Sequence, residues 1–80
     1  MDLQDEVVLN ILSYMDSLNI DIINGNRIKS YSFYLSSKID ISEKRLNNIL
    51  DINKKRTIKL DEVSKIAYAL NVPLYEFFQN

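Results

Sequence analysis

The stretch that decides the fold is residues 35–50, LSSKIDISEKRLNNIL. Apolar residues recur at helical spacing in each half, which predicts two short helices joined by a corner. In the first half, Leu35 and Ile39 are four positions apart and share one helical face. The apolar stripe predicted for the second half consists of Leu46, Ile49 and Leu50.

Ser42 is a good N-cap for the second of these helices, because its hydroxyl can accept a hydrogen bond from an amide one turn later. Glu43 follows where the positive end of a helix favours a carboxylate. The side chains predicted to point away from the apolar stripe are long or carry amides: Lys44, Arg45, Asn47 and Asn48. A short helix with an apolar back and such a front suits insertion into a DNA major groove.

The same stretch resembles the helix-turn-helix of the phage Cro/lambda-repressor-like (Xre-type) regulators. The residues that carry the resemblance here are Leu35, Ser36, Asp40, Ile41, Ser42, Leu46 and Ile49. Farther on, residues 65–78, KIAYALNVPLYEFF, resemble the last two helices of that family. The resemblance covers residues 28–78 and departs from the family pattern at Asp40, where Gly is usual.

The resemblance implies an all-α fold, a compact bundle of about five helices with a lambda-repressor-like DNA-binding domain. It implies a sequence-specific regulator of transcription, which we expect to be a repressor from a phage or mobile element. Double-stranded DNA would be read in the major groove by the helix after Ser42. Because one short helix reads few base pairs, we expect a homodimer on a pseudo-palindrome.

By analogy with the family, three side chains of this helix would read bases. Glu43 could accept from a cytosine amino group, Lys44 could donate to guanine, and Asn48 could pair with adenine. Glu43 has a simpler explanation as a favourable helix N-terminal residue. Arg45 and Asn47 would lie on the flank, near phosphate or solvent. The family's next loop follows the phosphate backbone, and here the matching residues are Asn53, Lys54, Lys55 and Arg56, although such a loop could simply be solvated.

The charge distribution supports a nucleic-acid partner even though the net charge is -1. Residues 1–26 hold five acidic residues and no Lys or Arg, whereas residues 27–59 hold nine Lys and Arg against three Asp and Glu. The basic third of the chain therefore coincides with the predicted helix-turn-helix, which is the electrostatic footprint of a DNA-binding surface.

The rest of the chain completes one domain, residues 1–80. We expect an acidic first helix at about 2–18, the helix-turn-helix at about 28–50, and later helices at about 60–70 and 74–78. The first helix of the helix-turn-helix begins near Arg27 or after a later cap at Ser30. Asn71 can end the third of these segments, and Pro73 can open the last one.

Two apolar features leave alternatives open. Val7, Leu9 and Tyr14 broaden the apolar stripe of the first helix, which therefore either lies across a small core or forms a homodimer contact. Phe33 and Tyr34 either cover the join with the first helix or form an exposed interaction patch.

Composition excludes several classes of protein. The chain has no Cys and no His, so it lacks the usual zinc ligands and the Ser-His or Cys-His nucleophile pairs. We therefore expect no metal, no cofactor and no enzymatic activity. No apolar run approaches the roughly 18 residues of a membrane span, and the acidic N-terminus does not read as a signal peptide. We expect a cytoplasmic protein without a membrane partner.

A protein-interaction module on the same fold is the alternative function. An antitoxin-like protein, or a phage or mobile-element inhibitor, could use this surface to bind a protein partner. The modest basic excess, the acidic Glu43 and the wide apolar first helix keep this alternative open.

Overall fold

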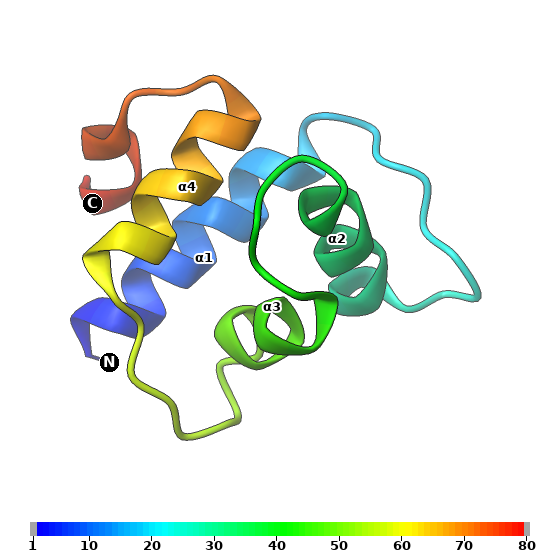
Figure 1. Ribbon diagram of the computed structural model, residues 1–80, viewed down its shortest axis with the longest axis horizontal. Coiled ribbons are helices and arrows are strands. Elements are labelled where there is room, and N and C mark those ends of the chain that lie inside the picture. The colour runs from blue at the N-terminus through cyan, green and yellow to red at the C-terminus, as the bar shows by residue number, and fades with distance from the viewer. Residues whose placement is uncertain (1, 80) are drawn as a thin grey trace.

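The computed structural model describes residues 2–79, and the regular structure of this part of the chain is helical throughout. Its elements are α1 (Leu3–Asp16), α2 (Arg27–Ser36), α3 (Glu43–Leu50), α4 (Leu60–Leu70) and the 3-10 helix η1 (Leu74–Phe78) (Figure 1). The all-helical class is thereby confirmed, with four α-helices and a five-residue last element that winds as a 3-10 helix, a form that proteins use in short pieces. The radius of gyration of 11.5 Å is that of a compact globule.

Local hydrogen bonds begin and end the helices largely where the sequence predicts. The Ser42 hydroxyl accepts from the Arg45 amide at 3.1 Å and caps α3. Asn71 ends α4 in the left-handed conformation, with φ of 57°. The later cap at Ser30 is wrong, because Asn26 caps α2 by accepting from the Lys29 amide at 3.0 Å. Ser30 is instead buried inside that helix.

A single core takes side chains from every helix. Its fully or nearly fully buried apolar members are Val7, Val8, Ile11, Leu12, Met15, Tyr31, Leu35, Ile41, Leu46, Ile49, Leu50, Val63, Ile66, Ala67, Leu70 and Phe77. The three apolar residues at the back of α3 all belong to it, so the core fixes the rotation of that helix. Its polar residues other than Asn47 are thereby turned toward the surface.

The broad apolar face of α1 is covered within the chain by η1. Val7 is buried, and the Tyr14 ring packs edge-on against Phe77, with ring centroids 6.4 Å apart and an interplanar angle of 73°. Of the three residues that broaden the stripe, Leu9 alone is classed as exposed. The first helix thus lies across the core, as one of the two alternatives expected.

The corner between α2 and α3 forms an ion pair with α4. Lys65 of α4 lies 3.1 Å from the Asp40 carboxylate in this corner and 3.4 Å from Asp61, one turn earlier in its own helix. Asp40, which stands where the resembled family has Gly, is not among the left-handed residues found within residues 2–79. Helices α2 and α3 pack directly against each other beside this corner (Figure 1).

Candidate nucleic-acid interface

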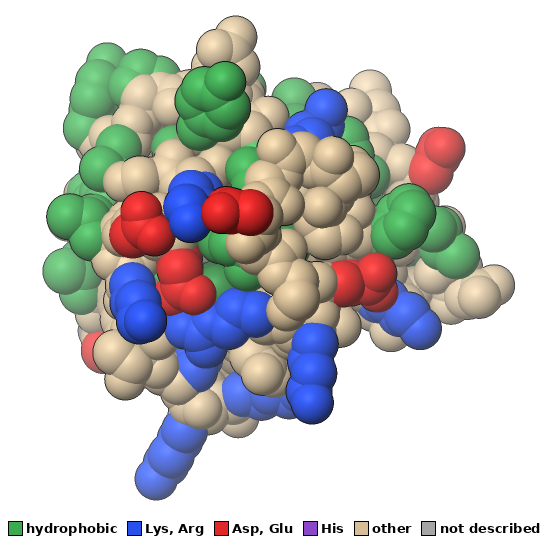
Figure 2. All heavy atoms as spheres, viewed as in Figure 1, with side chains coloured by type: hydrophobic (Ala, Val, Ile, Leu, Met, Phe, Trp, Pro, Cys, Tyr) green, Lys and Arg blue, Asp and Glu red, His purple; other side chains and the backbone are tan. Residues whose placement is uncertain are grey.

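The exposed side of α3 and the loop that follows it form the candidate interface. Ser42 and Lys44 are exposed, whereas Glu43, Arg45, Asn47 and Asn48 are half-buried. Lys and Arg side chains gather along the lower edge of the molecule in Figure 2, over α3 and this loop. The basic third predicted from the sequence therefore does form a surface feature.

Arg45 is taken up by an ion pair inside the fold. Its Nε lies 2.7 Å from Oε2 of Glu62, and its Nη2 lies 2.8 Å from Oε1 of the same carboxylate. Nη2 also donates to the Thr57 carbonyl at 2.7 Å. Arg45 thus ties α3 to α4, while 31% of its side chain stays exposed to solvent.

The Glu62 carboxylate at the centre of this tie has an unusual number of donors. Besides the two bonds from Arg45, its Oε1 accepts from the Lys59 amide at 2.9 Å. The hydrogen bonds from Arg45 lower the pKa of Glu62 below its ordinary value of 4.5. Glu62 therefore stays ionised at neutral pH and holds α3 against the start of α4.

Arg56 is likewise an internal residue, which corrects its assignment to the phosphate contacts. Its side chain is only 6% exposed, and its Nη1 lies 2.8 Å from the Asp5 carboxylate of α1. Its Nε and Nη2 donate to the Ile49 carbonyl at 3.2 and 3.0 Å. A guanidinium held in this way is not available to DNA.

The arginines and lysines of the basic third divide sharply between structural and free groups. The remaining arginine, Arg27, pairs with Asp16 at 2.7 Å. By contrast, the lysines of residues 27–59 have no carboxylate oxygen within 4.0 Å among residues 2–79; they are Lys29, Lys38, Lys44, Lys54, Lys55 and Lys59. The planar guanidinium suits two-bond pairing with a carboxylate, whereas the free positive charge of this surface comes from lysines.

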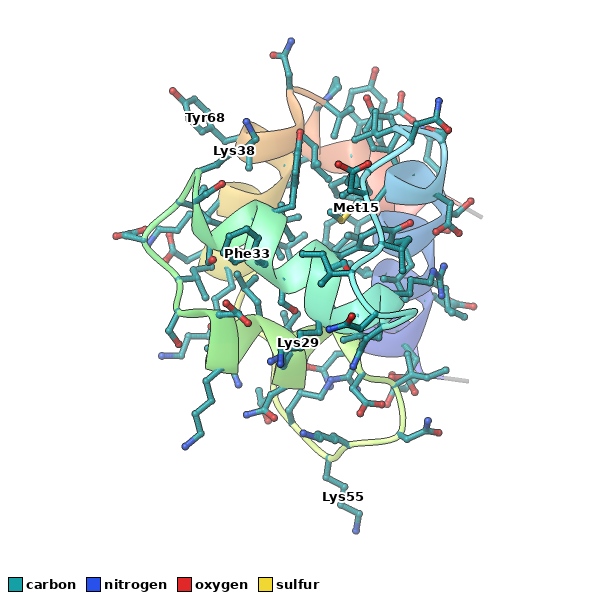
Figure 3. The ribbon with its side chains drawn as sticks, turned by 90° about the vertical axis from the view of Figure 1, so that its right-hand side faces the viewer. Met15, Lys29, Phe33, Lys38, Lys55 and Tyr68 are labelled. Atoms are coloured by element: carbon teal, nitrogen blue, oxygen red, sulfur yellow. The ribbon has the colours of Figure 1, made fainter. Side chains whose placement is uncertain are left out.

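Lys54 and Lys55 project from the loop after α3. Lys54 donates to the Asn48 carboxamide oxygen at 3.1 Å, so the loop touches one of the three candidate base-reading residues. Figure 3 shows Lys55 extending away from the body of the molecule. Asn53 is exposed, and its amide closes a turn on the Asp51 carboxylate at 3.0 Å.

Lys29, which sequence reasoning did not assign to the interface, joins it in the structure. It lines one hollow of about 330 Å³ together with Lys54. The full lining of that hollow is Asn26, Ile28, Lys29, Asn47, Asp51 and Lys54. No local signal marks Lys29, because its approach to the loop depends on the packing of α2 against α3.

Asn47 and Glu43 each line a hollow that Lys29 also lines. The Asn47 carboxamide oxygen is buried and has no hydrogen-bond partner among residues 2–79, so this side chain faces partly inward, toward the hollow beside α2. Glu43 lines a different hollow of about 250 Å³ with Ile23 and Phe33. The loop after α3 does not contribute to that second hollow.

The sequence left open whether Phe33 covers the join with the first helix or is exposed, and in the structure Phe33 is exposed. Its side chain is 56% exposed on the outer face of α2, beside the connection from α1 (Figure 3). Tyr34 is half-buried, with the Lys38 ammonium 5.0 Å from its ring centre. Other exposed apolar residues of this side of the molecule are Leu18, Ile22 and Ile23.

None of the helices within residues 2–79 has the length and apolar character needed to cross a membrane. Among the same residues, no three His, Cys, Asp or Glu side chains lie together as metal ligands would. The comparisons with known proteins found no matching family model, no similar curated protein and no similar solved structure.

Proposed function

We propose that this protein is a sequence-specific double-stranded DNA-binding regulator of transcription, a repressor, with a lambda-repressor-like domain. The observation that carries the proposal is the set of unpaired lysines around α3, namely Lys29, Lys44, Lys54 and Lys55. None of these four ammonium groups has a carboxylate partner within residues 2–79, so together they present positive charge on the surface around one short helix. Phosphate groups are the partners that such a surface suits.

The lysines would hold the duplex backbone while the front of α3 reads the bases. Lys54 and Lys55 project from the loop, and Lys29 lines the same hollow as Lys54, so lysines from α2 and from the loop could contact phosphates together. Asn48 would pair with adenine through the two polar atoms of its carboxamide. Its oxygen now accepts from Lys54, and that bond would exchange when the lysine turns to a phosphate.

Glu43 and Lys44 would contribute to specificity at the start of α3. Lys44 is exposed and can donate to guanine, and Glu43 can accept from a cytosine amino group. Glu43 lies between Lys44, its neighbour in the chain, and Lys29, with which it lines a hollow, so its carboxylate should locally weaken the attraction to phosphate. Discrimination against sequences that lack cytosine at this point would follow from the unpaired carboxylate.

A homodimer is part of the proposal, because the eight residues of α3 can read only a short half-site. The surface available for it lies away from α3. Leu3, Leu60 and Phe78 are exposed around a hollow of about 160 Å³. A second copy seated there would remove these apolar side chains from water.

The direct test is binding to the DNA upstream of its own gene, since small regulators of the resembled family often control themselves. Fluorescence anisotropy at several salt concentrations should give a steep fall in affinity as salt rises. A fragment of the same length from the gene interior supplies the control. Equal affinity for both fragments would refute sequence-specific binding, and no binding at low salt would refute DNA binding altogether.

A protein-binding role is a second candidate, and the exposed apolar side chains of Phe33 on α2 and Ile23 in the connection before it favour this role. Ile23 and Phe33 line two neighbouring hollows, of about 250 and 440 Å³. Exposed apolar side chains of this kind commonly mark protein interfaces. Under this candidate, Phe33→Ser would abolish capture of the partner while Lys55→Ala would not; under DNA binding, only the lysine variant should weaken binding to duplex DNA.

A further inference from the structure

The loop that carries Lys54 and Lys55 is held in place by the first turn of α1. Residues 51–59 contain no helix or strand, so their backbone groups need other partners. The Gln4 carboxamide supplies two of them: its Nε2 donates to the Arg56 carbonyl at 3.3 Å, and its Oε1 accepts from the Ile58 amide at 2.5 Å. One side chain of α1 thus grips the loop backbone on both sides of Thr57.

Arg56 is the second anchor of this loop. Its guanidinium reaches the Asp5 carboxylate of α1 at 2.8 Å and donates to the Lys54 carbonyl at 3.3 Å. The same group donates twice to the Ile49 carbonyl, which lies in the last turn of α3, where carbonyls lack helical partners. Arg56 therefore joins α1, the end of α3 and the backbone of Lys54.

We infer that Gln4 and Arg56 are positioning residues for the phosphate contacts of Lys54 and Lys55, an inference that rests on the proposed DNA binding. A loop of this length without regular structure would otherwise sample many conformations, and binding would have to order it. The hydrogen bonds of Gln4 and Arg56 hold the loop backbone in place before DNA binds. The start of α1 carries the acidic residues Asp2, Asp5 and Glu6, whose negative charges repel phosphate. The first turn of α1 should therefore affect DNA binding through the loop that it holds and not by direct contact with DNA.

The experiment compares Gln4→Ala with Asn10→Ala. Asn10 also lies in α1 and also bonds to a distant backbone segment, donating to the carbonyls of Phe77 and Gln79 at 2.9 Å each. Each variant loses two long-range hydrogen bonds from the same helix, so the two should lose similar thermal stability. Only the Gln4 variant frees the lysine-bearing loop.

Two measurements are made on the full chain below its thermal transition. Native-state amide exchange at Ile58 should accelerate in Gln4→Ala and stay at the wild-type rate in Asn10→Ala. Affinity for a non-specific duplex at low salt should fall about threefold to tenfold in Gln4→Ala alone. Unchanged exchange at Ile58, unchanged affinity, or equal losses of affinity in the two variants would each overturn the inference.

Failure of the proposed DNA binding and failure of the positioning role give different results in these measurements. If the wild-type chain binds no duplex at low salt, the proposed function fails, and the positioning role fails with it, even if exchange at Ile58 responds to Gln4→Ala. If the wild type binds and Lys55→Ala weakens that binding while Gln4→Ala does not, the proposed DNA binding stands. The inference that Gln4 and Arg56 position the loop lysines is then overturned.

Discussion

Arg45 of α3 and Glu62 of α4 form a two-bond ion pair, with Nε 2.7 Å from Oε2 and Nη2 2.8 Å from Oε1. The pair is partly buried, with 31% of the Arg45 side chain and 13% of the Glu62 side chain exposed to solvent. It joins the helix proposed to read DNA to the helix that follows in the chain. The orientation of α3 therefore depends on a charge interaction as well as on its buried apolar back.

Stability should depend on pH through Glu62. Its pKa is lowered in the folded chain by the hydrogen bonds from Arg45, so the ionised form stabilises the fold above the ordinary pKa of 4.5. This contribution is lost as the pH falls through the lowered value. At pH 7, Glu62→Gln should lower the free energy of unfolding by about 1–3 kcal/mol, and the difference from wild type should shrink in acid.

Urea unfolding of both proteins at a series of pH values measures this difference. Glu76→Gln, at an exposed carboxylate with no ion pair within residues 2–79, provides the matched control and should behave like wild type at pH 7. A Glu62 effect of the same size at neutral and acid pH would mean that the ionised carboxylate is not the stabilising form.

Arg56→Ala should act first on stability. The substitution removes the partner of Asp5 and leaves the Ile49 carbonyl without its two donors, which should cost roughly 3 kcal/mol. For a chain of this size the thermal midpoint should fall by more than about 10 °C. Arg27→Ala, which opens an exposed pair with Asp16, should cost less than about 1 kcal/mol. Similar midpoints for the two variants in calorimetry would contradict the internal role of Arg56.

Lys55→Ala should weaken DNA binding and leave thermal stability almost unchanged. The side chain is exposed and extends into solvent, so the thermal midpoint should stay close to wild type. If Lys55 neutralises a phosphate, the variant should bind all duplexes more weakly and flatten the slope of log affinity against log salt by about one unit. A salt titration with an unaltered slope would remove Lys55 from the interface. Arg56 was assigned to the same phosphate-contacting loop from the sequence, and its burial is the reason to expect a different effect of its substitution.

Asn48→Ala separates reading a base from holding the helix. The side chain is half-buried on the polar side of α3, and Ala is the better helix former, so the thermal midpoint should change little. Specific affinity should fall by roughly 1–3 kcal/mol, with relaxed preference at one base pair and unchanged non-specific binding. Selection from a randomised duplex library measures that preference. A large loss of stability with unaltered preference would show that Asn48 supports the fold instead.

The oligomeric state can be measured directly. We expect a homodimer by sedimentation equilibrium at micromolar concentration, with Leu60→Glu shifting it to monomer, because a carboxylate among Leu3 and Phe78 would have to be desolvated. Tyr68→Glu, at an exposed site of α4 that does not line this hollow, is the control and should remain dimeric. A single 9.4 kDa species of the wild-type chain would contradict the proposed dimer.

The sequence by itself predicted the helices and most of their ends, although α1 ends at Asp16 instead of near residue 18 and Asn26 caps α2 in place of Ser30. Helical periodicity and capping act between residues three or four positions apart, so they can be read along the chain. The cap at Ser42, the left-handed end at Asn71 and the apolar back of α3 were predicted in this way. The clustering of basic residues around α3 was also visible, because charge can be counted without a structure.

The tertiary structure alone decided which of these basic groups are free. Arg56 meets Asp5 across 51 positions and Arg45 meets Glu62 across 17, and no local pattern encodes those distances. Likewise Phe77 covers the side of α1 at Tyr14, which the sequence left open as a dimer contact. Ion pairs and packing depend on how separate helices approach in space, so only the assembled core could assign the three arginines to ion pairs and leave the lysines of this region without a carboxylate partner within residues 2–79.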